Sequence, residues 1–143
     1  MSIQKHKVYL AGQANEYENA WKEEFKKLDG FDFYDWEFDS DQTSPDTFFP
    51  DDLKGVKGAD FMVANPGLAA SEGTWVEIGY FYANNTKRPG DFCDKLIIIW
   101  REGRNPKWSI EFVKKTGFIV SSVEEAIKKL QELAIPVKQS ATV

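Results

Sequence analysis

The sequence predicts a single-domain α/β fold, a doubly wound flavodoxin-like or Rossmann-like sheet of about five mainly parallel strands flanked by helices. Short apolar segments alternate with helical ones along the chain, which is typical of strands joined by crossover helices. Residues 96–100 (Leu-Ile-Ile-Ile-Trp) are apolar on both faces, as expected for a central parallel strand. The 143 residues suit one domain, which we place at residues 1–136, with a C-terminal tail at 137–143.

The first half of the chain contains two predicted strands and a long polar segment. Residues 7–12 predict a buried first strand, and apolar residues at helical spacing predict a helix from Asn15 to Gly30. Residues 31–36 alternate imperfectly and predict a second strand. Residues 37–50 are polar and include two prolines, which indicates a long loop of the kind that is functional or disordered. A short helix is expected at residues 51–57.

The second half repeats the alternation of strands and helices. Residues 61–64 predict the third strand and residues 74–84 the helix after it. Residues 108–115 predict a short helix, and residues 118–120 a fifth strand. The last helix begins after Ser122, which can form a capping box with Glu125, and an apolar stripe continues to Leu133 before Pro136 ends it.

Charge and composition exclude several classes of function. The net charge is -5, with acidic residues clustered between Asp29 and Asp52, which argues against nucleic acid or an anionic membrane as a partner. No apolar run approaches a membrane span, and the first seven residues lack a signal-peptide pattern. The single cysteine, Cys93, cannot form an internal disulfide. We therefore expect a cytoplasmic protein.

The motifs for cofactors and metals are incomplete. Residues 67–74 lack the lysine of a phosphate loop, and only Gly12 follows the first strand where a dinucleotide fingerprint needs several glycines. Residues 39–50 mimic a calcium loop but carry Ser44 and Pro50 where glycine and glutamate are required. One histidine and one cysteine cannot build a zinc cluster. We expect no cofactor and no metal.

The remaining reactive side chains are carboxylates near the junctions of strands and helices. Glu77 is expected in the first turn of the helix after the third strand, where the helix N-terminus favours the ionised form. Its neighbours Val76 and Ile78 indicate partial burial, and a buried carboxylate without a task is costly. An ionised carboxylate in a cleft can be a nucleophile or can stabilise a cation. Asp52 as a helix cap and Glu72 as a solvated loop charge remain open alternatives.

Three blocks of sequence resemble the nucleoside 2-deoxyribosyltransferases and the related nucleoside and nucleotide N-glycosidases. They are residues 8–12 (Val-Tyr-Leu-Ala-Gly), residues 52–60 (Asp-Leu-Lys-Gly-Val-Lys-Gly-Ala-Asp) and residues 73–80 (Gly-Thr-Trp-Val-Glu-Ile-Gly-Tyr). Residues 119–126 are also similar to the end of the family's domain. The blocks span most of the domain in the family's order, and the second and third together are the specific part of the match.

The resemblance implies a nucleoside 2-deoxyribosyltransferase. Glu77 would attack the anomeric carbon of a 2-deoxynucleoside, forming a covalent deoxyribosyl-enzyme that a second base resolves with net retention. Asp52 would contact the departing base and manage its proton, and Tyr9 would orient the nucleophile. Deoxyribose lacks the electron-withdrawing 2-hydroxyl, so a fixed carboxylate can stabilise its cationic transition state. The implied partners are small-molecule nucleosides and nucleobases.

The resemblance also implies substrate-binding positions and an assembly. Gly12, Ser71, Glu72 and Gly73 would contact the substrate, although Ser71 stands where the family often has an aspartate six residues before the nucleophile. Asn105 corresponds to an asparagine that completes a neighbouring subunit's site, which implies a homodimer or higher homo-oligomer with shared active sites. A turn asparagine before proline is an equal reading of Asn105.

Two other functions remain open. An N-glycosidase on the same scaffold would use water as acceptor, and Ser71 with the adjacent glycine-containing turn would then bind a 5-phosphate. The lack of a clear basic cluster favours nucleosides over nucleotides. A non-catalytic nucleotide-binding module is the third reading, although pure recognition does not require a carboxylate aimed at the anomeric carbon.

Overall fold

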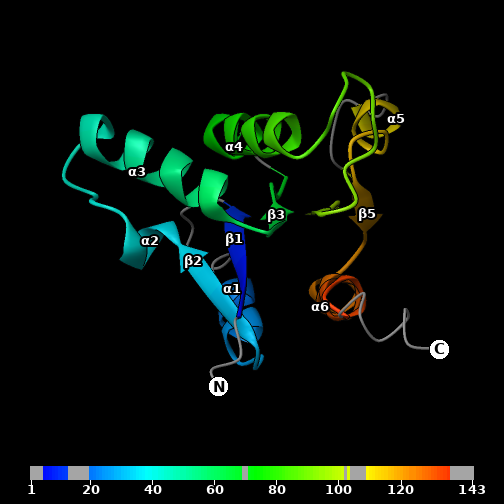
Figure 1. The fold of residues 1–143 in the computed structure, drawn as a ribbon, viewed down its shortest axis with the longest axis horizontal. Helices are drawn as coiled ribbons and strands as arrows, with labels where there is room; N and C mark the ends of the chain where they lie inside the picture. The colour runs from blue at the N-terminus through cyan, green and yellow to red at the C-terminus, as the bar shows by residue number, and fades with distance from the viewer. Residues whose placement is uncertain (1–4, 13–19, 69–70, 102, 104–108, 136–143) are drawn as a thin grey trace.

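The computed structural model describes residues 5–12, 20–68, 71–101, 103 and 109–135, and Figure 1 shows their arrangement. Five parallel strands form one sheet in the order β2-β1-β3-β4-β5. They are β1 (His6–Gly12), β2 (Phe31–Asp35), β3 (Phe61–Asn65), β4 (Leu96–Ile99) and β5 (Phe118–Val120). The predicted fold class is therefore confirmed.

The strand order reverses direction between β1 and β3. The chain moves from β1 outward to β2 and then returns past β1 to β3, so the connections leaving β1 and β3 diverge. Gly12 at the carboxyl end of β1 lies opposite Asn65 at the carboxyl end of β3. In open α/β sheets, ligands bind outside the strand carboxyl ends at such a reversal. The topology therefore places a candidate site above Gly12 and Asn65.

Helices cover both faces of the sheet, as Figure 1 shows. Helices α3 (Pro45–Gly58) and α4 (Glu72–Asn84) lie on one face, and α1 (Ala20–Lys26) and α6 (Val123–Leu133) on the other. Alternate residues of β1 serve the two layers, because successive side chains of a strand point to opposite faces. Tyr9 packs under α3 and α4, whereas Val8 and Leu10 pack toward α1 and α6.

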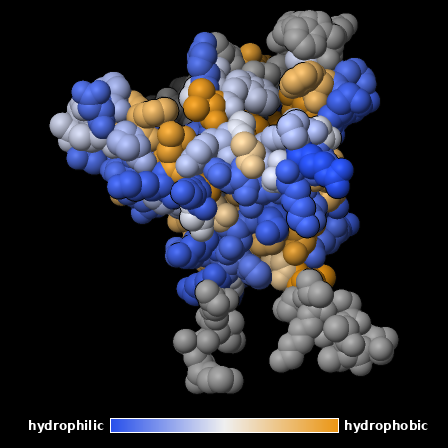
Figure 2. Space-filling model, turned by 45° about the horizontal axis from the view of Figure 1, so that its top comes forward, coloured by the Kyte–Doolittle hydropathy of each residue, from blue (hydrophilic) through white to orange (hydrophobic). Residues whose placement is uncertain are grey.

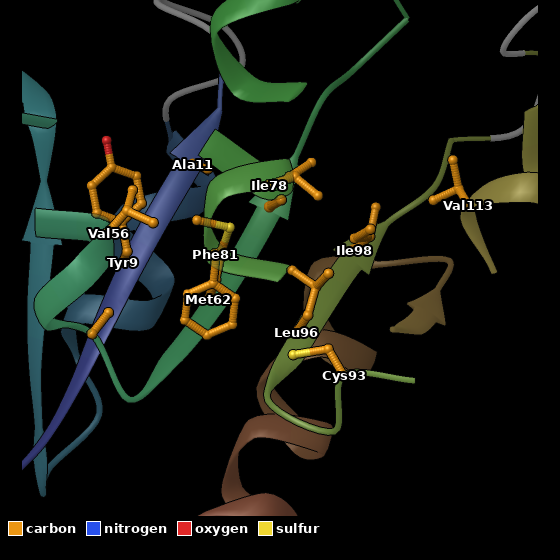
Figure 3. Close-up of a cluster of buried hydrophobic side chains, with 12 residues drawn as sticks. Tyr9, Ala11, Val56, Met62, Ile78, Phe81, Cys93, Leu96, Ile98 and Val113 are labelled. Carbon is orange, nitrogen blue, oxygen red and sulfur yellow. The ribbon is translucent and has the colours of Figure 1, made fainter. Parts of the chain in front are cut away.

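The core beneath α3 and α4 forms the floor of the candidate site. Val56 of α3, Ile78 and Phe81 of α4 and Met62 of β3 pack together with Tyr9, and Figure 3 shows this cluster. The hydroxyl oxygen of Tyr9 points away from the other labelled side chains in that view. A polar atom is thus presented at the boundary of an otherwise apolar layer.

The predicted loop at residues 37–50 is wrong, and the following helix is longer than expected. Helix α2 (Trp36–Asp39) follows β2 directly, and α3 begins at Pro45 with Ser44 as its N-cap. Ser44 and Thr47 form a capping box, and proline at the first helical position needs no hydrogen-bond donor. Pro50 lies inside α3, so one helical hydrogen bond is absent there, but the helix continues to Gly58.

The remaining elements match the sequence expectations within a few residues. Helix α4 begins at Glu72, two residues earlier than expected, and the short helix α5 spans Ser109–Val113. Ser122 caps α6 by accepting the Glu125 amide. The carboxylate of Glu125 reaches the Ser121 amide, one residue before the position that a capping box requires. Asn15, the expected start of the first helix, lies outside the described residues.

The face of the molecule drawn in Figure 2 is largely hydrophilic, with exposed apolar residues interspersed. The large exposed apolar side chains include Val76 of α4 and Phe112 of α5, at 51% and 67% exposure. Within the described part of the chain, no helix has the length and apolar character needed to span a membrane.

Candidate active site

Tyr9 and Glu77 meet directly across the layer between β1 and α4. The Tyr9 hydroxyl donates a hydrogen bond to Oε2 of Glu77 at 2.5 Å. Tyr9 is fully buried and Glu77 is partly buried. A short bond of this kind to a carboxylate is charge-assisted, so it fixes the orientation of the Glu77 side chain. The predicted pairing of these two residues is present in the structure.

Helical periodicity explains why Glu77 faces Tyr9. Residues three and four apart share a helix face, and Thr74, Ile78 and Phe81 form the buried side of α4. Glu77 lies at the edge of that side, one turn after Thr74 and one before Phe81. The same rule places Asp52 on the sheet-facing side of α3, one turn before the buried Val56. The two carboxylates thus face the carboxyl half of β1 from different helices.

The ionisation of Glu77 differs from the sequence expectation. Because α4 begins at Glu72, Glu77 is in the second turn of the helix, beyond the strong field of its N-terminus. Burial raises the pKa of Glu77 from 4.5 to about 7, and the negative charge of Asp52 acts in the same direction. The hydrogen bond from Tyr9 and the charge of Lys22 oppose that rise. Desolvation, rather than the helix dipole, therefore controls this carboxyl.

Asp52 is a second carboxylate with a perturbed environment. It lies in the middle of α3 and does not open the helix, so the alternative reading of Asp52 as a helix cap is wrong. Burial raises its pKa, with a contribution from neighbouring Asp51, while a hydrogen bond with Ser40 and the charge of Lys22 oppose the rise. Its Oδ1 atom is buried and has no hydrogen-bond partner. A buried acceptor of this kind is costly unless a ligand satisfies it.

Tyr34 supports Tyr9 from the neighbouring strand. The two residues are directly opposite in the β1–β2 register, and their rings stack at 5.1 Å with an interplanar angle of 15°. The Tyr34 hydroxyl donates to the Asp51 carbonyl at 3.3 Å, which connects β2 to α3. Burial, with the charge of Asp52, raises the pKa of Tyr34 to about 12. The phenol of Tyr34 therefore stays neutral beside the carboxylates.

Two further buried polar atoms at the sheet's carboxyl edge lack partners. They are Oδ1 of Asn65, at the end of β3, and Oγ of Ser71, immediately before α4. Both residues are 8% exposed. Ser71 occupies the N-cap position of α4 but its side chain makes no cap hydrogen bond. Since most buried polar groups in proteins are hydrogen-bonded, these atoms mark places for ligand or water.

The other predicted site residues have simpler positions. Glu72 and Gly73 are exposed in the first turn of α4. Gly12 ends β1, where an added Cβ would lie 2.8 Å from the Trp21 ring and 3.2 Å from the Asn65 carbonyl oxygen. Glycine is therefore required for the close approach of these elements. Asn105 lies outside the described residues.

Sequence reasoning missed Asn65, Tyr34 and Lys22. Asn65 had a usable signal, because a polar residue that ends an apolar strand lies at the ligand-binding edge of the sheet. Tyr34 had none, since its role depends on the register of β1 against β2. Lys22 of α1 is fully buried. Because lysine is almost never fully buried unless it is paired, this burial could not be predicted from the sequence.

An apolar cavity lies on another part of α4. It has a volume of about 490 Å³ and lies between α4 and α5, beside Trp75, Tyr82 and Phe112. Neither Glu77 nor Asp52 is among its described lining residues. The carboxylate site is separate from this cavity. Among the described residues, Tyr9, Asp52 and Glu77 form its floor.

Comparison with known proteins supports the fold. No family model and no curated protein matches the chain. One similar solved structure is the Clostridium botulinum CMP N-glycosidase BcmB, with a TM-score of 0.60 and 24% sequence identity, covering 87% of this chain and 97% of that one. Another is the solution structure of BlsM, with a TM-score of 0.60 and 19% identity, covering 92% and 91%. At these identities the likeness establishes a shared fold.

Proposed function

We propose that this protein cleaves the N-glycosidic bond of a nucleoside 5-monophosphate, with Glu77 as nucleophile and water as acceptor. The observation that carries the proposal is the hydrogen bond of 2.5 Å from Tyr9 to Glu77 at the sheet's ligand-binding edge. The bond engages Oε2 of Glu77, and in the proposed reaction the other carboxylate oxygen attacks a sugar carbon. The fold shared with a CMP N-glycosidase supports this class of reaction.

The two carboxyl groups divide the chemistry. An oxygen of ionised Glu77 forms a bond to the anomeric carbon while the bond from that carbon to the base nitrogen breaks. The electron pair leaves with the base, and Asp52 protonates the base, a role that its raised pKa favours. Water then attacks the same carbon and gives a proton to the ionised Asp52, the bond from that carbon to Glu77 breaks, and the sugar phosphate forms with net retention.

The N-terminus of α4 supports a 5-phosphate as part of the substrate. Ser71 precedes a helix of 13 residues, and its buried hydroxyl is unpartnered. Free amide groups at a helix N-terminus bind anions, and a hydroxyl beside them adds a donor. A phosphate at this place would occupy the position where the family's transferases often carry an aspartate, whose negative charge would repel it.

Deoxyribosyl transfer to a base is the second candidate. Partial burial of Glu77 favours it, because a glycosyl ester shielded from water survives long enough for an incoming base. Both reactions share the covalent intermediate and differ only in the acceptor. The non-catalytic binding module is less well supported, since pure recognition does not require a partly buried carboxylate held by a tyrosine hydroxyl.

An acceptor assay distinguishes these functions. CMP, dCMP and their nucleosides are incubated with the protein, with and without a second free base, and the products are separated by chromatography. We expect free base from a monophosphate at a rate independent of the acceptor. A new nucleoside or nucleotide would favour the transferase, and no turnover of any substrate would contradict both. Glu77→Gln should abolish turnover, whereas Glu124→Gln, an exposed change on α6, should not.

We also propose that the protein acts as a homodimer or larger homo-oligomer. The exposed Val76 and Phe112 are apolar side chains that association of copies would cover. Sedimentation equilibrium of the full chain tests this, with Phe112→Ser as a variant expected to weaken association. A fully active protein with the mass of one chain would contradict a shared site.

A further inference from the structure

An unpaired hydrogen-bond donor and an unpaired acceptor lie at the carboxyl edge of the sheet. They are the indole nitrogen Nε1 of Trp21 and the side-chain oxygen Oδ1 of Asn65, which are both buried and have no hydrogen-bond partner. Trp21 is 6% exposed and Asn65 is 8% exposed. Because most buried polar atoms in proteins are hydrogen-bonded, a donor and an acceptor left unpaired at one edge indicate a common partner.

The alternation of side chains along the strands places both residues on the α1 face of the sheet. Leu10 and Val63 belong to the core beneath α1 and α6, and Trp21 packs into the same core from α1. Gly12 and Asn65 follow Leu10 and Val63 by two residues in β1 and β3, so they face the same way. Gly12 and Asn65 are also partners in the β1–β3 register.

Gly12 brings the Trp21 ring close to Asn65. A Cβ built on Gly12 would lie 2.8 Å from Cζ2 and 3.3 Å from Cε2 of the Trp21 ring, and 3.2 Å from the backbone carbonyl oxygen of Asn65. Nε1 is bonded to Cε2, so the edge of the indole that carries the donor is the edge that covers Gly12. Since neighbouring strands lie about 4.8 Å apart, one small group can reach both Nε1 and the Asn65 side chain.

The chemistry of the two atoms selects the group that can satisfy both of them. The indole N–H of Trp21 only donates and Oδ1 of Asn65 only accepts, so the partner must accept one hydrogen bond and donate another. A hydroxyl does both with a single oxygen. A phosphate near neutral pH carries mainly acceptor oxygens and lacks the donor for Asn65. Both atoms are also shielded from bulk solvent, which favours a small group over the edge of a base.

We propose that Trp21 and Asn65 form a subsite for a ribose hydroxyl of the nucleotide substrate. The subsite rests on the proposed function and adds recognition of the sugar to it. Asp52 faces the base from α3, on the other side of the sheet, and Ser71 is assigned to the 5-phosphate. Asn65 ends β3 six residues before Ser71, and the sugar is the part of the substrate that joins base to phosphate. A hydroxyl held here fixes the sugar carbon that Glu77 attacks.

The indole N–H of Trp21 reports directly on this contact. Its resonance in proton–nitrogen NMR spectra, assigned by its loss in Trp21→Phe, is followed while ribose 5-phosphate, 2-deoxyribose 5-phosphate or inorganic phosphate is added. We expect ribose 5-phosphate to move the indole proton downfield, because a hydrogen bond to oxygen forms, and inorganic phosphate to leave it in place. The deoxy sugar then identifies the hydroxyl: a lost shift assigns the 2-hydroxyl, and a kept shift assigns a hydroxyl that this sugar retains.

Two substitutions test the subsite by affinity. Trp21→Phe and Asn65→Ala should each weaken the binding of ribose 5-phosphate about three- to tenfold, the value of one hydrogen bond, and leave the affinity for inorganic phosphate unchanged. In the double variant the losses should not add, because both bonds hold one oxygen. Trp21→Phe keeps an aromatic ring against Phe25, whose ring centroid lies 5.7 Å away. Asn85→Ala is the matched control, because it removes the same side chain at the other end of α4, where its amide donates to the Phe81 carbonyl.

The outcomes separate this subsite from the proposed reaction. A Trp21 indole resonance that stays in place, or that inorganic phosphate moves equally, overturns the subsite even if CMP is cleaved, and leaves Trp21 as a core residue. A downfield shift in a protein that cleaves no nucleotide supports the subsite and contradicts only the reaction. Should Trp21→Phe fail to fold, the indole is assigned in wild type through its contact with Phe25, and Asn65→Ala provides the affinity test.

Discussion

The backbone of Gly55 on α3 packs directly against the ring of Tyr34 on β2. A Cβ added at Gly55 would lie 3.0 Å from three carbons of that ring. The other partner of the Tyr34 ring is Tyr9, stacked at 5.1 Å. A small residue in α3 therefore allows β2 to support the residue that orients Glu77.

Gly55→Ala should destabilise the protein and lower its activity. Alanine gains about 1 kcal/mol in a helix interior. Overpacking against Tyr34 costs about 1–3 kcal/mol and displaces the ring toward Tyr9. We expect a net loss of about 1 kcal/mol in urea unfolding and a kcat several-fold lower. Gly79→Ala is the matched control, because nothing lies within 4 Å of its added Cβ in α4. A stabilised and fully active Gly55→Ala would contradict this account of the contact.

Tyr9→Phe should shift the pH dependence of activity more than it affects folding. The change keeps the ring that stacks on Tyr34 but removes the donor that lowers the pKa of Glu77. The acid limb of the kcat/KM profile should therefore move above pH 7, and kcat should fall by about 10–100-fold because the nucleophile is less well oriented. Tyr82→Phe removes a comparable hydroxyl that donates to the Asp91 carbonyl and should leave the profile unchanged. An unaltered profile in Tyr9→Phe would argue against the hydrogen bond.

The raised pKa of Glu77 also predicts a stability that depends on pH. Because its pKa in the folded state is about 7 against an ordinary value of 4.5, the folded protein binds this proton more tightly than the unfolded chain. Its contribution is neutral below pH 4.5, becomes unfavourable as the pH rises to about 7, and is constant above that. Glu77→Gln should therefore stabilise the protein at pH 8 by on the order of 1–3 kcal/mol and have little effect near pH 4.

Urea unfolding of wild type and Glu77→Gln at pH 4 and pH 8 measures this difference in the free energy of unfolding. Groups that titrate in the same way in both proteins cancel in the comparison. An equal effect at both pH values would show that Glu77 carries no perturbed ionisation. Together with lost turnover, the expected gain would make Glu77 a residue retained for function at a cost in stability.

The strands were predictable because their apolar runs are short and interrupted by glycine, asparagine and polar turns. Residues 96–100 and the apolar stripe of α6 specify their elements locally. The helical start of the segment before Asp52 was hard to predict, because prolines such as Pro45 and Pro50 in a polar segment are also typical of a loop. Ser44 followed by proline is a signature of a helix start, because proline at the first helical position needs no hydrogen-bond donor.

The residues of the candidate site were predictable where the side-chain type itself indicates a chemical role. Glu77, Asp52 and Tyr9 were identified from their blocks of sequence, and the structure brings Glu77 into contact with Tyr9. The ionisation of Glu77 was not predictable, because its pKa depends on burial, on the hydrogen bond from Tyr9 and on the charges of Asp52 and Lys22. The position of Tyr34 depends on the register of β1 against β2, and the burial of Lys22 depends on its ion pair with Asp35. The periodicity of the sequence predicts neither of these contacts.

Ser71→Ala should separate a role in binding from a role in folding. The Ser71 hydroxyl is buried and unpartnered, so its removal should leave the free energy of unfolding unchanged or slightly higher. If it binds the 5-phosphate, KM for a nucleoside 5-monophosphate should rise about tenfold or more, while turnover of the matching nucleoside should not change. Ser122→Ala is a contrasting control at another helix N-cap. That side chain accepts the Glu125 amide at 3.1 Å, so its loss should cost about 1 kcal/mol and leave KM unchanged. Equal losses for nucleoside and monophosphate in Ser71→Ala would place this hydroxyl away from the phosphate and return the nucleoside to the position of preferred substrate.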